Sequence, residues 1–237
     1  MTWLESWADM TLLDFSRGPA MKVAMFVFVL GCVWRLLGIA LLRGRRDLST
    51  PRHANKWKGL RLMGLRSWPR KEFLGGTAFG EALGYTFHAG FFIALLFFLP
   101  HVLFFTDIFR GLGIPSLSSV TGFSWPTLSS GTIYFFSAIS AAALLAVLVH
   151  RIINPVKRML SNFDDYFSWF VTFAPIVTGM AAVSHVLLPY QTLLALHYLS
   201  VALLLIWFPF GKLMHMYYIF TTRGVEGVQF ERRGATL

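Results

Sequence analysis

The residues of this chain that could do chemistry are histidines in apolar surroundings. His197 and His215 stand at the two ends of the segment HYLSVALLLIWFPFGKLMH, which is otherwise almost wholly apolar. An ionisable side chain in such a segment usually faces the interior of a helix bundle and serves a function, and neutral imidazole is a common metal ligand. The sequence therefore points to metal ligation, with a hydrogen bond to a neighbouring helix as the alternative for any single histidine.

The spacing of His197 and His215 predicts where they lie on a helix. Eighteen residues turn through about five whole revolutions at ~100° per residue, so the two side chains would share one face. Their rise of roughly 27 Å is close to the hydrocarbon thickness of a bilayer. We expect one histidine near each surface, which is the arrangement that one cofactor per leaflet requires.

His88 and His101 lie on a second apolar segment, which runs in the opposite direction. Pairing by depth joins His88 with His215 near the cytoplasm and His101 with His197 near the outside. Two neutral imidazoles on opposite sides of an iron give a six-coordinate haem suited to electron transfer. The 13-residue interval turns by about −140°, so the pair would not share a face on a straight helix, and Pro100 predicts a kink just before His101.

Two further histidines compete for these roles. His150 ends the third apolar segment beside Arg151, and His185 lies near the outer end of the fourth. Each is an alternative ligand, and each could equally bond a haem propionate or a quinone oxygen. His185, together with Tyr190 and Gln191, is the better candidate for a quinone site.

The elements that position these histidines are predicted to be five transmembrane helices. The apolar runs cover about 21–42, 82–106, 131–150, 166–188 and 191–220, and each approaches or exceeds the ~20 residues that span a bilayer as a helix. Only 14% of the residues are charged, against ~25% in soluble domains. Open strands cannot satisfy their backbone in lipid. The sequence predicts an all-α integral membrane protein, with residues 1–237 forming one domain.

The positive charge predicts the orientation of the helices, because cytoplasmic loops are rich in Lys and Arg. Ten such residues fall in the segment 43–72, and most of the others follow the third helix or lie in the tail, so the N-terminus is expected outside and the C-terminus in the cytoplasm. The segment 43–72 is interpreted either as attraction to anionic membrane lipid, worth ~1 kcal/mol per residue near the surface, or as a docking site for a cytoplasmic partner. With the charge of +10 clustered in this way, nucleic acid is not an expected partner.

The single cysteine, Cys32, restricts the redox chemistry. One thiolate cannot hold an iron–sulfur cluster, so electrons passing through this chain need another carrier. The first twenty residues contain acids and lack a basic start before an apolar core. We therefore expect the first apolar helix to act as an uncleaved insertion signal.

Four stretches carry a resemblance to a known family: LLDFSRGP, FHAGFF, HRIINPVKRMLSNFDDY and LHYLSVALLLIWFPFGKLMHMYYIFTTRGVEG. They resemble the gamma subunit of respiratory nitrate reductase, a five-helix dihaem cytochrome b, and in particular the branch found with heterodisulfide-reductase-like and sulfur-metabolism membrane complexes. The similarity covers nearly the whole chain, and its most diagnostic element is the 18-residue histidine spacing. The interval between His88 and His101 is longer than in the nitrate reductase members.

The resemblance implies two b haems, with ligands that fall on His88, His101, His197 and His215. It also implies quinol or quinone exchange near the outer haem, and electron transfer through the inner haem to a cytoplasmic iron–sulfur subunit of a respiratory oxidoreductase complex in the cell inner membrane. Arg35 is then a propionate partner or structural counter-charge near the inner haem, or else a residue snorkelling to the interface. Lys212 is similarly a propionate partner or an interfacial anchor.

Two other classes of function were weighed against this one. A haem-free membrane scaffold would anchor a soluble partner through the segment 43–72, and its histidines would only form hydrogen bonds. An ion or proton transporter is disfavoured because Glu81, Asp164 and Asp165 lie at the boundaries of spans, and no acid lies in the middle of one.

Overall fold

The computed structural model describes residues 11–41, 50–52, 57, 61, 64, 74–115 and 124–234. In these residues every element of secondary structure is a helix. In chain order they are α2 (Leu12–Phe15), a π-helical turn (Ser16–Ala20), α3 (Met21–Leu41), α5 (Leu74–Phe97), α6 (Leu99–Gly111), α8 (Ser130–Ile153), α9 (Pro155–Leu160), α10 (Phe163–Ser184), α11 (Tyr190–Trp207), a 3-10 turn (Lys212–Met214) and α12 (His215–Arg233). Apart from residues 50–52, 57, 61 and 64, the predicted basic segment 43–72 lies outside the described residues.

Five helical stretches are long and apolar enough to cross a membrane. They are Leu12–Leu41, Gly75–Phe97, Ser130–Ile153, Phe163–Ser184 and Tyr190–Trp207. Large apolar side chains on these stretches face outward, and on α3 Phe26 is 65% and Trp34 77% exposed. A soluble protein of this size would not leave so much apolar surface in water. The prediction of an all-α, multi-pass membrane protein is therefore confirmed at this level.

Two of the predicted helices are interrupted. The predicted helix 82–106 is divided at Phe98, whose extended backbone (φ −82°, ψ 123°) separates α5 from α6. The predicted helix 191–220 is divided after Trp207, and helical structure resumes in a 3-10 turn and then at His215. The prediction of one continuous helix from His197 to His215 is therefore wrong. The shared face and the 27 Å rise that depended on it do not apply.

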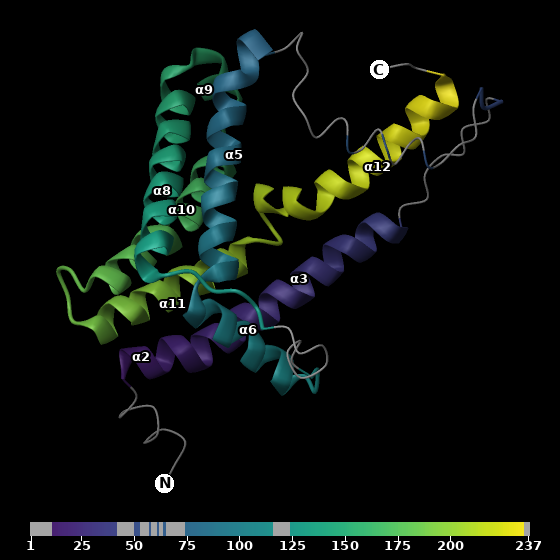
Figure 1. Ribbon diagram of the computed structural model, residues 1–237. Helices are drawn as coiled ribbons and strands as arrows, with labels where there is room; N and C mark the ends of the chain where they lie inside the picture. The colour runs from purple at the N-terminus through teal and green to yellow at the C-terminus, as the bar shows by residue number, and fades with distance from the viewer. Residues whose placement is uncertain are drawn as a thin grey trace. The chain divides into compact units, whose positions relative to one another are not determined.

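The chain forms two compact units, the first comprising residues 1–21 and 82–204. Here α5 packs against α8, because Gly90 brings the two backbones together: a Cβ at this position would lie 2.6 Å from the Phe136 carbonyl oxygen. Ser140 Oγ also donates to Phe87 O at 2.9 Å. Helix α10 also packs against α8, where the Trp169 indole donates to Leu144 O at 2.8 Å. The three helices lie side by side in Figure 1.

The connection from α8 to α10 is fixed by polar contacts. Asn154 and Asn162 cap α9 and α10 respectively, and the second cap is reciprocal with Asp165. Arg151 forms a 2.9 Å ion pair with the largely buried Asp165 and donates to Ser161 Oγ at 2.9 Å. Capping side chains satisfy amide groups that a helix leaves unpaired at its start. The stretch HRIINPVKRMLSNFDDY therefore has a structural role in joining two spans through a short helix.

The second unit comprises residues 22–81 and 205–237. Its contacts join α3 to the segment between α11 and α12. A Cβ at Gly31 would lie 2.5 Å from Cγ of Pro209, so glycine is needed for this approach. One turn earlier on α3, the Phe28 ring meets Phe208 edge to face, with ring centroids 5.3 Å apart. The interruption after α11 is thus packed directly onto α3.

Candidate histidine site

The structure brings His101 and His197 together within the first unit. Their ring centroids are 6.1 Å apart and the ring planes are inclined by 23°. His101 comes from α6 and His197 from α11, and both side chains are partly buried. Two ring nitrogens bonded at about 2 Å to a metal lying between them would place their ring centres roughly 6 Å apart. This centroid spacing equals that of two imidazoles bound to one metal ion, and it also lies in the range of stacked rings without a metal.

The break between α5 and α6 positions His101. Pro100 has no amide hydrogen to donate to Leu96 O, and its ring clashes with that carbonyl in a regular helix. The chain accordingly turns at Phe98, and α6 begins with Pro100 in its first turn. His101 then reaches back, and its Nδ1 donates to Ala94 O at 2.9 Å. The kink predicted from Pro100 is present, and it fixes the orientation of the imidazole.

The segment that follows residue 123 donates hydrogen bonds to the last turn of α5 at the same break. Trp125 Nε1 donates to Leu96 O at 2.7 Å, and the Leu128 amide donates to Phe97 O at 2.9 Å. The rings of Trp125 and Phe97 lie 6.2 Å apart. An unpaired carbonyl in a membrane segment is costly, so non-helical backbone there needs such donors. These contacts of Trp125 and Leu128 therefore stabilise the break next to His101.

His197 is held by residues of α10 and α11. Thr178 Oγ1 lies 3.3 Å from His197 Nδ1 and 2.9 Å from Ser200 Oγ. Gly179 lies against the face of the imidazole, where an added Cβ would be 3.1 Å from Cε1. In both members of the pair, Nδ1 faces an oxygen of the protein. A proton on Nδ1 leaves the lone pair of Nε2 for a metal, which is the usual arrangement of a ligand histidine.

His88 and His215 belong to different units, and each is described by itself. His88 Nδ1 donates to Gly84 O at 2.7 Å, and its ring lies 4.7 Å from the Phe87 ring, centroid to centroid. His215 is exposed at the start of α12 and donates from Nδ1 to Lys212 O at 2.9 Å. Since a carbonyl oxygen can only accept, both imidazoles carry the proton on Nδ1. Each has the same tautomer as His101.

Arg35 contacts the interrupted segment of the second unit. Its Nε donates to Pro209 O at 3.1 Å, and its guanidinium carbon lies 6.0 Å from the centre of the Tyr218 ring. Pro209 follows the end of α11, where the backbone has left the helix. Arg35 therefore has a role that the sequence did not suggest, as a donor to this interruption. Lys212 lies in the 3-10 turn, and its carbonyl is the acceptor for His215.

The candidate quinone residues lie at the turn between α10 and α11. His185 ends α10 in a left-handed conformation (φ 55°), and its ring lies 5.0 Å from the Tyr190 ring at an angle of 26°. Gln191 follows on α11, and all three side chains are exposed. His150, at the end of α8, has its Nδ1 3.4 Å from Lys157 Nζ. The structure thus brings His185 and Tyr190 together.

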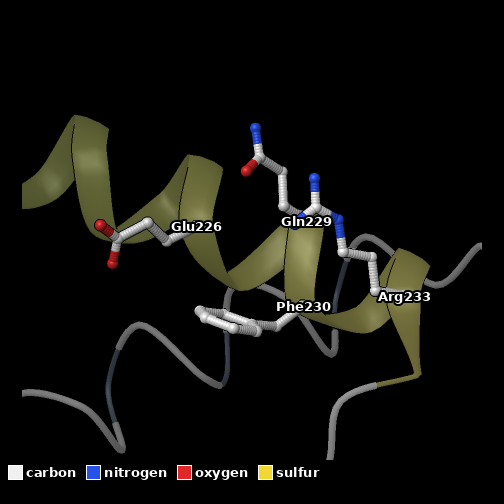
Figure 2. A pocket seen from close by; sticks show the side chains of 4 residues that line it. All are labelled: Glu226, Gln229, Phe230 and Arg233. Carbon is white, nitrogen blue, oxygen red and sulfur yellow. The ribbon is translucent and has the colours of Figure 1, made fainter. Parts of the chain in front are cut away.

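A separate hollow lies along α12. It has a volume of about 160 Å³ and is lined by Glu226, Gln229, Phe230 and Arg233. Figure 2 shows Gln229 and Arg233 projecting on one side of the helix and Phe230 on another. None of the predicted site residues lines this hollow.

Three residues at the histidine pair were missed by sequence reasoning: Trp125, Thr178 and Gly179. The available signals were the SWP tripeptide after a Ser/Gly-rich loop and a Thr–Gly pair inside an apolar helix. Neither identifies its partner, because the contacts depend on how different helices pack. Among the described residues, no group of three or more His, Cys, Asp or Glu comes together.

A comparison with known proteins identifies a relative. A protein of Nitratidesulfovibrio vulgaris (strain Hildenborough), described only as "Protein", is 31% identical over 236 residues, covering 97% of this chain and 92% of its own length. No family model and no solved structure matches the chain.

Proposed function

The chain belongs to the same family as this Nitratidesulfovibrio vulgaris protein, and because the name of that relative gives no activity, we propose a function from the chain's own residues. It is a membrane cytochrome b subunit, similar to the gamma subunit of respiratory nitrate reductase. It transfers electrons between the quinone pool and a cytoplasmic iron–sulfur subunit through two bis-histidine b haems. In this proposal the N-terminus is outside and the C-terminus cytoplasmic, in the cell inner membrane.

The observation that carries the proposal is the pairing of His101 with His197. The sequence paired them by depth, and their ring centroids lie 6.1 Å apart. Both rings have Nδ1 engaged by an oxygen, from Ala94 on one side and Thr178 on the other. The donor set fits a haem, because His101 and His197 would hold its iron and the haem would supply one-electron transfer there.

A haem held by two neutral imidazoles supplies one-electron transfer, with no open position for oxygen chemistry. The protein's contribution is to hold the imidazoles neutral, oriented and away from water. Ala94 O and the α5–α6 break fix the ring of His101. Thr178 and Gly179 fix the ring of His197. A rigid pair of ligands lowers the reorganisation that accompanies a change of charge.

The remaining assignments are carried from the sequence. His88 and His215 are proposed as ligands of the inner haem, with Arg35 and Lys212 as candidate partners of its propionates. The quinone site is proposed at His185, Tyr190 and Gln191, where the stacked rings of His185 and Tyr190 present two polar tips beside an apolar surface. The single cysteine, Cys32, makes a separate iron–sulfur subunit necessary.

A haem-free scaffold is the second candidate function, and the distance between the His101 and His197 rings also fits it. Aromatic rings pack with centroids about 4.5–7 Å apart without any metal, and the 6.1 Å pair falls within that range. Under this reading the imidazoles join α6 to α11 and carry no electrons.

The absorption spectrum of the purified full chain separates the two candidates. We expect two b haems per chain by pyridine haemochrome assay. His101→Ala and His197→Ala should each remove the same single haem, judged by the spectrum of what remains. His150→Ala tests the alternative ligand named from the sequence and should keep both haems. A colourless wild-type protein, or unchanged colour in both pair variants, would refute the cytochrome.

A further inference from the structure

Three residues form a small cradle around the imidazole of His197. Thr178 and Gly179 come from α10, and Ser200 lies on α11 less than one helical turn after His197. The Thr178 hydroxyl lies 3.3 Å from His197 Nδ1 and 2.9 Å from the Ser200 hydroxyl. Ser200 Oγ also lies 2.7 Å from the carbonyl oxygen of His197. Both the backbone and the side chain of His197 are thus tied to the same pair of hydroxyls.

The hydrogen count makes Thr178 an acceptor toward the imidazole. A threonine hydroxyl has one proton and two lone pairs. The short contact from Thr178 Oγ1 to Ala174 O, 2.7 Å, uses the proton within α10. With the Ser200 proton directed to Thr178 Oγ1 at 2.9 Å, the remaining lone pair of Thr178 faces His197 Nδ1, so that Nδ1 is the donor. In this arrangement Nε2 is left as the ligand.

Gly179 makes the contact between Thr178 and His197 possible. A Cβ at position 179 would lie 3.1 Å from Cε1 and 3.2 Å from Nδ1 of His197. These distances are shorter than ordinary van der Waals contact, so any larger residue would push the ring away from α10. The ring lies against the helix backbone only because residue 179 has no side chain.

We propose that Thr178 is a positioning residue that sets the orientation and the donor strength of His197, and so tunes the redox potential of the haem bound by His101 and His197. This inference rests on the proposed cytochrome function. A hydrogen bond accepted from Nδ1–H makes an imidazole a stronger electron donor, and a stronger donor favours the oxidised iron. Loss of the Thr178 hydroxyl therefore raises the midpoint potential of one haem and leaves the other in place.

The test compares three variants of the full chain in detergent. Thr178→Val removes the hydroxyl with little change in shape, and Thr178→Ser restores it. Thr172→Val is the matched control, because Thr172 lies on the same helix and makes the same kind of bond, donating to Ser168 O at 2.7 Å. The readouts are haem content per chain and a potentiometric titration of both haems. Among these three variants, we expect a more positive midpoint potential for one haem only in Thr178→Val.

Each outcome decides between the inference and its alternatives. Loss of one haem in Thr178→Val with retention in Thr178→Ser also supports the inference, since only the hydroxyl distinguishes them. Equal potentials in wild type, Thr178→Val and Thr178→Ser overturn it, as does the same shift in Thr172→Val. Gly179→Ala keeps the hydroxyl but crowds the ring, and should shift the same haem. A wild-type protein without haem would instead overturn the proposed function.

Discussion

Two helices in this molecule are interrupted, and the backbone carbonyls at the two interruptions accept hydrogen bonds from different kinds of donor. The α5–α6 break lies just before Pro100 and the α11–α12 break contains Pro209, and each precedes a candidate ligand, His101 or His215. At the first break, neutral groups donate to the last turn of α5: an indole, a backbone amide and the imidazole itself. At the second break, the guanidinium of Arg35 donates to Pro209 O.

The difference shows how each break depends on the rest of the chain. The first is one residue long, and two of its three donors, Trp125 and Leu128, come from the segment that leads into α8. The second runs from Trp207 to His215, includes a 3-10 turn, and is packed against Gly31 and Arg35 of α3. Irregular backbone at membrane depth persists only where protein groups satisfy it. We therefore expect the two breaks to be destabilised by substitutions at different residues.

The largest loss of stability is expected for Gly31→Ala, at the second break. A Cβ at this position would lie 2.5 and 2.6 Å from two carbons of the Pro209 ring, which cannot move aside as a flexible side chain would. Forcing such an overlap costs about 1–3 kcal/mol or more. Thermal unfolding in detergent should show a clear drop in Tm. Gly38→Ala, on the same helix with nothing within 4 Å, is the control, and an equal drop there would refute the contact.

Arg35→Met should cause the next largest loss of stability. It removes the donor to Pro209 O, and a hydrogen bond to a charged group contributes about 1.5–3 kcal/mol. Arg35→Lys sharpens the test, because lysine keeps the charge but has no Nε–H at the required position. If Arg35 serves as a donor to the break, the Arg35→Lys variant should recover only part of the Tm that Arg35→Met loses. Full recovery with Lys would favour the snorkelling or propionate interpretation made from the sequence.

Trp125→Phe tests the first break and should have a smaller effect. It leaves Leu96 O without the indole donor, at a cost of about 1–3 kcal/mol for an unsatisfied buried group. Part of that cost is relieved because Trp125 is half exposed. Trp169→Phe is the comparison: its indole also donates to a carbonyl, Leu144 O, but one within a continuous helix. The Trp125 variant should lose more Tm and part of its haem, and equal behaviour of the two would contradict this account.

The sequence predicted some of this architecture and missed the rest for physical reasons. Hydropathy was sufficient for five spans, and Pro100 was sufficient for the kink before His101, because a missing amide hydrogen acts locally. Pro209 lies in an equally apolar run, yet the continuous helix 191–220 was predicted through it. Whether that segment breaks depends on Arg35 and Gly31, which are more than 170 residues away and whose contact no local pattern reveals.

The site was predicted to a similar extent. The pairing of His101 with His197 followed from counting residues through antiparallel spans. The cradle of Thr178 and Gly179 did not, because it depends on which face of α10 meets α11. The hydroxyl and the glycine have no distinguishing signal in an apolar helix until that packing is known.

The smallest single effect is expected for Pro100→Ala, and its combination with Trp125→Phe is the sharpest test of the first break. Alone, Pro100→Ala should change Tm and haem content little, because the indole and the Leu128 amide still hold the carbonyls of Leu96 and Phe97. In the double variant, the amide of residue 100 can donate to Leu96 O and a regular helix can re-form. Tm should then recover relative to Trp125→Phe.

Haem content should move in the opposite direction in that double variant. On an unbroken helix, His101 would lie about −140° around from His88, turned away from the position that the break gives it. The double variant should therefore be more stable than Trp125→Phe and yet hold less of the haem bound by His101 and His197. Such non-additivity is expected only between residues that act on one structural element. If stability and haem content instead fell together and additively, the break would not be what orients His101.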